Sequence, residues 1–447
     1  MLAAFRRNPR DKAIAALAIP ALGTLAMDPL VSIVDTVWVA RLGTNALASV
    51  AIASAVFAAL FSIFNFVSMT VTPLVAGEVG SGNRTGAGTV SKGAVVVSCA
   101  VGIAVALIAI VAASGIVSVF GASRIVSMDA TVYLRIRFLA LPAMLVAMVG
   151  HGVFRGHSDT RTPLLVALGM NLINIVLDPI LMFWVGLGIA GAAWATVAAQ
   201  WFAAGCFILL MFWLRSHTLG TDGPFGTMRS LPYMRILRAG WPMMIRSAAL
   251  LVALLATTFA ASRIGTADVA AHQIALQVWL FLSFVLDSYA VAAEAMVGTD
   301  LGGGAVSAAR RVSNRLLALG FVTGCVLSLA LVLTAPLIPI AFSAEPAVAS
   351  GLRSIYPFVI MLQPLTALVY VWDGIGIGAS SFRYLGASMV VASVLCIATL
   401  LLVGTTLVGV WVSVLVLSLT RLAALALWHR FGPLAPGRGP SLASQAA

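Results

Sequence analysis

Long apolar runs, separated by short polar connections, dominate the pattern of this chain. A helix needs about 20 mostly apolar residues to cross a hydrocarbon core of about 30 Å, because each residue advances it by about 1.5 Å. We therefore predict an all-α polytopic membrane protein with about twelve transmembrane helices. The expected spans are 13–40, 46–76, 92–114, 131–153, 163–185, 189–214, 237–262, 268–298, 314–342, 352–376, 384–404 and 407–429.

Two of the apolar runs, 162–214 and 384–420, are too long for one helix. We divide them at Gly186–Gly191 and Gly404–Thr406, where glycine and β-branched residues weaken a helix. The count of twelve depends on these two divisions.

An internal repeat organises the twelve runs. The segment ARLGTNALASVAIA at 40–53 recurs 222 residues later as SRIGTADVAAHQIA at 262–275. The same offset aligns Gly152 and Gly156 with Gly374 and Gly378. Each copy holds six spans, an even number, so the copies enter the membrane in the same direction and form two parallel six-helix bundles. Duplicated halves around a central cavity are typical of alternating-access transporters.

The repeat and the polar connections predict five segments. They are a cytoplasmic N-terminal segment (1–12), an N-terminal bundle (13–214), a cytoplasmic linker (215–234), a C-terminal bundle (235–430) and a disordered tail (431–447).

Composition and charge agree with a membrane protein. Of the 447 residues, 61% are hydrophobic and 9% charged, against about 45–50% and about 25% in soluble domains. The net charge of +12 comes from basic residues in short loops, which form no stripe for nucleic acid. Most of them fall on the side of both termini, which we expect to be cytoplasmic, at the inner membrane. The other side holds Arg41, Arg124, Arg135, Arg137, Arg263 and Arg353.

No enzyme site is indicated. The chain has no GxSxG, HExxH, phosphate loop or nucleotide fingerprint in a suitable context, so we expect no catalytic residues and no cofactor. The four cysteines lie singly inside apolar runs without metal-ligand spacing. We predict no dedicated metal site.

Ionisable residues inside spans are the candidate functional residues, because a charge at the bilayer centre costs about 2.5–3.5 kcal/mol. Asp28 and Asp35 lie seven residues apart on one face of the first span, which Pro20 interrupts. Alternatively, Asp35 is an interfacial acid paired with Arg41, six residues away.

Polar residues also share one face of the fifth span. Asn174 and Asp178 are four residues apart, and Thr196 and Gln200 repeat that spacing on the sixth span. These side chains could line a hydrated pocket. Alternatively, they join neighbouring helices by hydrogen bonds, which contribute about 0.6 kcal/mol each.

The second half carries different charges. Asp287 and Glu294 lie on the eighth span, Asp373 on the tenth and Arg246 on the seventh. A buried arginine needs an anion. From the sequence, Asp28, Asp287 and Glu294 are the candidates for a structural or gating ion pair with Arg246.

Several motifs resemble the multidrug and toxic compound extrusion (MATE) family, in its DinF-like branch. They are DPLVSIVDT at 28–36, RLGTNALA at 41–48, FRGHSDTRTPL at 154–164, NIVLDP at 174–179, GAAWATVAAQ at 191–200, HQIALQVWLFLSFVLDSYAVAAEAMVG at 272–298 and WDGIGIGAS at 372–380. The resemblance implies a V-shaped, twelve-helix antiporter that exports cationic or amphipathic compounds against inward H⁺ or Na⁺ flow.

The resemblance also implies roles for residues. Asp35 matches the family's first-helix acid, and Asn174, Asp178 and Thr196 match the polar cluster around it. Pro20 matches the proline at which that helix bends. The acid set of the other main bacterial branch is missing from the second half, so H⁺ is favoured, although Na⁺ would also suit Asp35, Asn174 and Asp178. We expect a monomer in the lipid bilayer with a small-molecule substrate. A flippase for a lipid-linked compound or an exporter of organic anions is the alternative.

Overall fold

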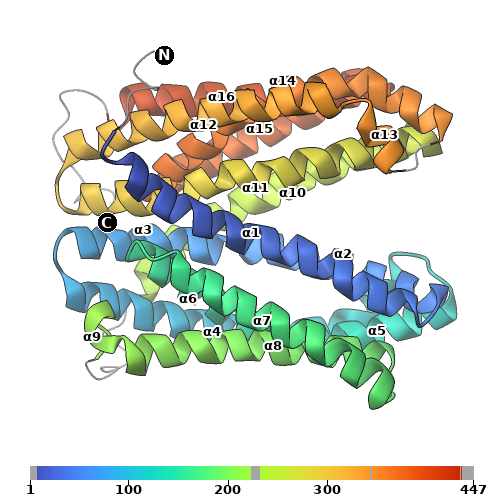
Figure 1. Cartoon of the computed structure of the whole chain (residues 1–447), viewed down its shortest axis with the longest axis horizontal. Coiled ribbons are helices and arrows are strands. Elements are labelled where there is room, and N and C mark those ends of the chain that lie inside the picture. The colour runs from blue at the N-terminus through green and yellow to red at the C-terminus, as the bar shows by residue number, and fades with distance from the viewer. Residues whose placement is uncertain (1–7, 223–231, 343–344, 433, 435–447) are drawn as a thin grey trace. The chain divides into compact units, whose positions relative to one another are not determined.

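The computed structural model describes residues 8–222, 232–342, 345–432 and 434, and this part of the chain contains helices and no strands (Figure 1). The α-helices are α1 (Asp11–Ala40), α2 (Thr44–Phe64), α3 (Phe66–Gly80), α4 (Arg84–Ser118), α5 (Arg124–Phe138), α6 (Leu141–Gly156), α7 (Arg161–Pro179), α8 (Ile189–Leu209), α9 (Ser216–Leu219), α10 (Tyr233–Ile264), α11 (Thr266–Gly302), α12 (Val306–Thr334), α13 (Leu337–Ala341), α14 (Pro346–Gly378), α15 (Phe382–Val403) and α16 (Leu407–Phe431). The π-helical segments η2 (Ile180–Trp184) and η3 (Leu210–Leu214) continue α7 and α8.

About twelve membrane-spanning segments follow from these helices, which confirms the predicted fold class. Eleven segments within the described residues are long and apolar enough to cross a membrane. The helices α5 and α6, bent by 49° at a short break, together supply a twelfth. Pro142 stands at the beginning of α6, where a helix tolerates proline because that position has no intrahelical N–H partner.

Both divisions of the long apolar runs are confirmed. Between η2 and α8 the chain turns through Gly186 and Gly188, whose φ values of 78° and 55° suit glycine. Between α15 and α16 the hydroxyl of Thr406 accepts a hydrogen bond of 3.1 Å from the backbone N–H of Gly409. This cap fixes the beginning of α16.

The chain divides into two compact units, which we call the N-terminal unit (Gly23–Leu237) and the C-terminal unit (Met1–Leu22 with Arg238–Ala447). The sequence predicts residues 13–22 in the N-terminal bundle, whereas the structure packs them in the C-terminal unit. Ile14, Leu17 and Ala18 of α1 are buried in an apolar cluster with residues of α11, α12, α14 and α16. Hydropathy identifies a span without indicating which bundle buries it.

The repeated glycines explain how each unit packs its helices. An added Cβ at Gly156 on α6 would lie 2.9 Å from a backbone oxygen of α3, and one at Gly374 on α14 would lie 2.4 Å from a backbone oxygen of α11. Gly152 and Gly378 make similar close approaches at the same two helix pairs. Small residues four apart let membrane helices touch along their backbones. The 222-residue repeat therefore corresponds to the same helix contact in both units.

The connection between α6 and α7 is held by Asp159. Its carboxylate accepts hydrogen bonds from the backbone N–H groups of Arg161 and Thr162, both at 3.0 Å, and from the Thr162 hydroxyl at 2.6 Å. The guanidinium of Arg215 lies 2.8 Å from the same carboxylate. Partial burial raises the pKa of Asp159, but the hydrogen bonds from Thr162 and Arg215 outweigh this effect and hold the pKa below its ordinary value.

Candidate functional site

A small cavity of about 40 Å³ lies inside the N-terminal unit. Five helices, α1, α2, α5, α7 and α8, contribute to its walls. The polar side chains that line it are Ser32, Asp35, Thr36, Ser54, Tyr133, Asp178 and Thr196. The structure thus brings together Asp35, Asp178 and Thr196, which the family resemblance predicts as one site.

Helix α7 supplies the most deeply buried part of the site. Asn171, Asn174 and Asp178 follow one another at helical spacing and are exposed by only 6%, 3% and 1%. Pro179 ends α7 directly after Asp178, and the chain continues as the π-helical η2. Proline has no N–H to donate, and π-helical segments of this kind are frequent at functional sites.

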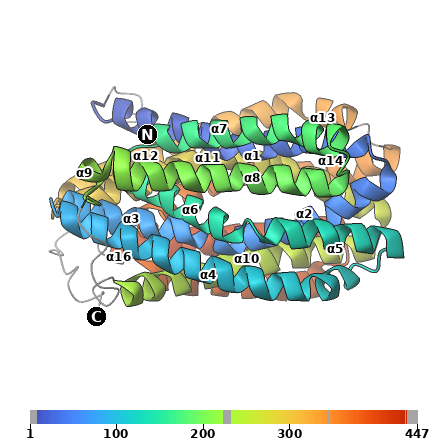
Figure 2. The same ribbon diagram turned by 90° about the horizontal axis from the view of Figure 1, so that it is seen from below.

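Helices α7 and α8 lie side by side, as Figures 1 and 2 both show. Gly191 near the beginning of α8 permits this, because an added Cβ would lie 2.6 Å from the backbone carbon of Leu181 in η2. The approach places Thr196 opposite Asn174, whose amide nitrogen lies 3.4 Å from the Thr196 hydroxyl. That hydroxyl donates to the Ala192 carbonyl at 3.0 Å.

The carboxyl groups of Asp35 and Asp178 lie within hydrogen-bonding reach of each other. One oxygen of Asp35 and both oxygens of Asp178 are buried without a hydrogen-bond donor among the described residues. Two ionised carboxylates at this separation repel each other, and a proton or a cation between them removes the repulsion. The pair is therefore suited to holding one exchangeable positive charge.

Two residues of α5 belong to this neighbourhood and are missed by the sequence reasoning. Tyr133 is buried and lines the cavity together with Thr196. Arg137 lies over the ring of Phe57, 4.1 Å from its centre, and interacts electrostatically with Asp35 and Asp178.

The sequence counts Arg137 among the arginines of outer loops, whereas the structure places it in the last turn of α5. Its Nε and Nη1 atoms are buried and find no hydrogen-bond acceptor among the described residues. The signal available in the sequence was its position inside the expected span 131–153.

The interfacial alternative for Asp35 does not match the geometry. Arg41 lies over the ring of Trp38, 4.6 Å from its centre. In the described part of the chain, no ion pair joins Arg41 to Asp35. Gln200 stands on α8 with its side-chain oxygen buried and without a donor there, but it does not line the cavity. Asp28 lies in α1, and its side chain is outside the described residues.

A second polar cluster lies in the C-terminal unit, around Arg246. The guanidinium of Arg246 on α10 binds Asp373 on α14, with Nη2 2.7 Å from Oδ2. Arg421 on α16 contacts the same carboxylate oxygen. The sequence names Asp28, Asp287 and Glu294 as candidate partners and misses Asp373, whose ion pair with Arg246 the structure shows. A single sequence does not specify which helices of a bundle are neighbours.

Asp287 and Glu294 are further acids of this unit inside the expected spans. Asp287 on α11 interacts electrostatically with Arg246 and with Tyr370. Glu294, also on α11, is exposed by only 3%. Arg421 is missed by the sequence reasoning, although a basic residue inside the expected span 407–429 was visible there. Within the described residues, no group of three or more histidine, cysteine, aspartate or glutamate side chains is arranged to hold a metal ion.

Comparison with known proteins identifies relatives over almost the entire chain. The sequence profile of the MatE family matches residues 20–180 and again 242–402, so the two matches begin 222 residues apart. "Protein DETOXIFICATION 43" of Arabidopsis thaliana is 31% identical, over 98% of this chain and 92% of its own length. "DNA damage-inducible protein F" of Escherichia coli (strain K12) is 26% identical, over 94% of this chain and 92% of its own.

The fold also has solved counterparts. A crystal structure of a MATE protein in complex with MaL6 superposes with a TM-score of 0.81 at 23% sequence identity. It covers 95% of this chain and 96% of its own.

Proposed function

The chain belongs to the MatE family of multidrug and toxic compound efflux transporters, and from this premise we propose that it is a secondary active antiporter coupled to H⁺. Its substrates are cationic or amphipathic compounds. The observation that carries the proposal is the pair of half-buried Asp35 and buried Asp178 at a cavity lined by five helices.

The size of the cavity supports an ion site in preference to a substrate site. Sites for drug-sized molecules measure about 300–1,000 Å³, whereas a water molecule occupies about 30 Å³ in the liquid. A volume of about 40 Å³ accommodates water or a small ion but no drug-sized molecule. Asp35 and Asp178 therefore serve the coupling ion, and the organic substrate binds elsewhere in the protein.

Coupling follows from the electrostatics of the pair. When both carboxylates are ionised, they attract cations and repel each other; a proton shared between them cancels the repulsion and weakens the attraction for a cation. Protonation then favours whichever conformation of α1 brings the two carboxyl groups together. Pro20 supplies a position where α1 lacks one intrahelical hydrogen bond and can bend.

We propose H⁺ over Na⁺ because two carboxyl groups can share one proton without further ligands, whereas Na⁺ needs several oxygen ligands around it. Arg137 interacts electrostatically with both acids and opposes either positive charge, so it does not decide between the two ions. The carboxylate, hydroxyl and amide oxygens around the cavity are ligands that a hard cation accepts, so the choice needs a direct test.

The test is transport by the purified full-length chain in liposomes. Ethidium uptake is measured under an imposed pH gradient, and separately under a Na⁺ gradient at equal pH. We expect the pH gradient to drive transport, and Asp35→Asn and Asp178→Asn each to abolish the gradient-dependent part.

Asp129→Asn, which removes an acid of the same unit outside the cavity, is the matched control and should transport normally. Gradient-driven transport that survives in both Asp35→Asn and Asp178→Asn would remove the pair from the coupling role. Transport driven by the Na⁺ gradient alone would show that Na⁺, and not H⁺, is the coupling ion.

A second candidate function rests on the C-terminal cluster. Arg246 and Arg421 both bind the carboxylate of Asp373, and closely spaced guanidinium groups are suited to binding a carboxylate anion. We propose export of organic anions as the alternative, in which the anion competes with Asp373 for the arginines. This alternative predicts two results: the wild type transports a tricarboxylate but not ethidium, and Arg421→Met loses the tricarboxylate transport.

We also propose an orientation of the chain in the membrane. We propose that the protein is a monomer in the cytoplasmic membrane with both termini on the cytoplasmic side, because arginine and lysine predominate in the loops of that side. Cysteine substitutions at Ser81 and at Gly121, probed with an impermeant thiol reagent on intact cells, distinguish the two sides. Labelling of the Ser81 position from outside would reverse the orientation.

A further inference from the structure

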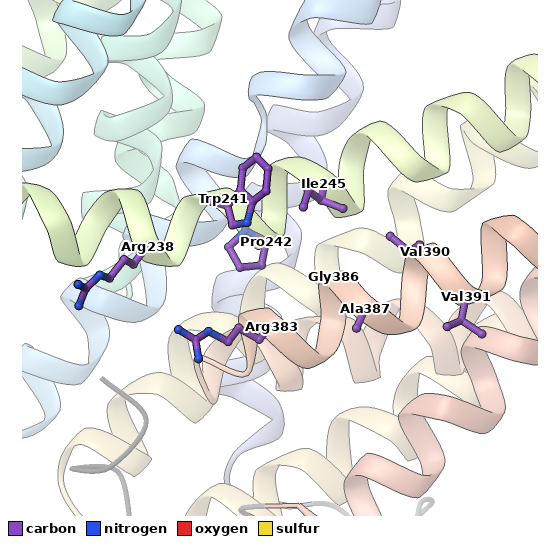
Figure 3. Close-up of a pocket in the computed structure, with 9 residues that line it drawn as sticks. All are labelled: Arg238, Trp241, Pro242, Ile245, Arg383, Gly386, Ala387, Val390 and Val391. Carbon is purple, nitrogen blue, oxygen red and sulfur yellow. The ribbon is translucent and has the colours of Figure 1, made fainter. Parts of the chain in front are cut away.

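The C-terminal unit contains a groove of about 610 Å³ between α10 and α15 (Figure 3). All residues that line it belong to these two helices. The volume is within the range of about 300–1,000 Å³ that small-molecule sites occupy.

The floor of the groove is the point where the two helices touch. Gly386 on α15 packs against Pro242 on α10, and an added Cβ would lie 2.8 Å from the Pro242 carbonyl oxygen. The walls on either side are apolar and exposed: Trp241 is exposed by 60% and Val391 by 54%. Exposed apolar side chains on membrane-spanning helices are suited to contact with lipid hydrocarbon.

One end of the groove is cationic. Figure 3 shows Arg238 from α10 and Arg383 from α15 extending to the same end, with Ile245, Val390 and Val391 at the other. Both arginines are exposed. Among the described residues, no carboxylate forms an ion pair with either of them. The groove thus offers two free guanidinium groups beside an apolar channel.

The dimensions suit an amphipathic ligand. Arg383 and Val391 are eight residues apart on one helix, which corresponds to about 12 Å along the groove. Arg383 is the second residue of α15, whose 22 residues extend about 33 Å, close to the thickness of the hydrocarbon core of about 30 Å. The cationic end therefore lies at the depth of lipid headgroups, where Trp241 is also typical of the interface.

We propose that this groove binds an anionic phospholipid, with the phosphate between Arg238 and Arg383 and one acyl chain along Ile245, Val390 and Val391. Planar guanidinium groups bind phosphate oxygens with two hydrogen bonds each, and two from neighbouring helices clamp one phosphate. A neutral or zwitterionic lipid fills the same apolar channel but gains less from the arginines. The site is separate from the Asp35–Asp178 cavity and does not rest on the proposed function.

The proposal is tested by native mass spectrometry of the purified full-length chain. Phosphatidylglycerol and phosphatidylcholine with the same acyl chains are titrated in parallel, and the first bound lipid is quantified. We expect phosphatidylglycerol to bind more tightly. Each basic residue contributes about 1 kcal/mol to attracting anionic lipid, so we expect about a fivefold loss for Arg238→Ala or Arg383→Ala and about 25-fold for both.

Two further variants separate this site from general surface charge. Arg311→Ala with Arg430→Ala removes two other exposed arginines of the same unit and should leave the first binding event unchanged. Ala387→Phe fills the apolar part of the groove and should weaken phosphatidylglycerol while leaving both arginines in place. Thermal unfolding of each variant reports whether the fold is intact.

The outcomes that overturn the proposal are specific. Equal affinity for the two lipids, or an unchanged affinity in the Arg238→Ala/Arg383→Ala variant, shows that the groove does not select an anionic headgroup. Glycerol phosphate serves as the probe without acyl chains. If it binds as tightly as phosphatidylglycerol and Ala387→Phe has no effect, the groove is a site for free phosphate esters and not for a lipid.

Discussion

The sequence indicates some of the site residues by their type and spacing, and it gives no indication of others. Asp35 and Asp178 stand out because charges inside spans are rare, and the spacing of Asn174 and Asp178 predicts their common face. Tyr133 carries no charge. It lies on α5, and only the tertiary structure places this helix beside the other helices of the cavity. In the sequence, Arg137 resembles the many loop arginines that mark membrane topology. Only the structure shows that it lies over the ring of Phe57 and interacts electrostatically with Asp35 and Asp178.

Asp178→Asn is predicted to abolish proton exchange at the cavity. The amide cannot share a proton with Asp35 as a carboxyl group does, so substrate binding should no longer release protons. The measurement is the pH change on adding ethidium to the detergent-solubilised protein in weak buffer. The Asp129→Asn protein should release protons as the wild type does; an unchanged signal in Asp178→Asn contradicts the role of this carboxyl.

Asp159 gives a prediction outside the membrane-spanning segments. Because its pKa is lowered in the folded protein, its stabilising effect is complete above the unfolded pKa of about 3.9 and is lost as the pH falls through the lower folded pKa. Asp159→Ala should therefore reduce stability at pH 7 by about 0.5–2 kcal/mol, the usual effect of losing a capping residue. The reduction should shrink towards pH 3.

Thermal unfolding in detergent at the two pH values measures this difference. Asp129→Ala serves as the control, since Asp129 makes no capping contact. A reduction that stays constant from pH 7 to pH 3 would show that the charge of Asp159 contributes nothing.

At the scale of helices, the apolar runs and the glycine positions predict most of the observed helices and the breaks between them. The spans, the two divisions of long runs and the repeat are all visible in the sequence, because each depends on local composition. The break between α5 and α6 is less visible, since residues 131–153 read as one continuous span. The partners of each helix are not local properties, which is why the sequence identifies the glycines without identifying the surfaces that they touch.

Gly374→Ala tests whether the repeated glycines hold helices in contact. The added methyl group would lie 2.4 Å from the Ala290 carbonyl oxygen on α11, and backbone cannot yield as a flexible side chain does. We expect a loss of about 1–3 kcal/mol, as for other overpacked interiors, seen as a lower midpoint of thermal unfolding.

Gly205→Ala is the matched control. Gly205 also lies in a helix, but an added Cβ there meets nothing within 4 Å. This change should stabilise the protein by about 0.5–1 kcal/mol, because alanine favours a helix over glycine. Similar midpoints for the two variants would contradict close packing at Gly374.

At the scale of the whole molecule, the two units share a repeated helix contact and have different polar clusters. The positions that correspond to Asp35 and Asp178 at the 222-residue offset are Thr257 and Leu400. The positions that correspond to Arg246 and Arg421 are Thr24 and Ala199. The sequence predicts this chemical difference in outline, but it does not predict that Asp373 joins two arginines from different helices.

Asp373→Asn is predicted to destabilise the C-terminal unit strongly. Removing the acid leaves the buried charges of Arg246 and Arg421 facing each other, and breaking such a pair usually costs about 3–5 kcal/mol. Adding Arg421→Met should restore part of the loss, since one positive charge is removed. Thermal unfolding of the single and double variants measures the recovery, and a double variant no more stable than Asp373→Asn would exclude charge imbalance as the cause.

The glycine contacts that recur in both units have a consequence for how the chain has changed over time. A half-length ancestor that assembled as a pair of identical copies would carry every polar residue twice, and any substitution would alter both copies at once. Fusion into one chain removes that restriction. The glycines remain tied to the helix contacts that both halves need, whereas acids and arginines become free to change in one half alone.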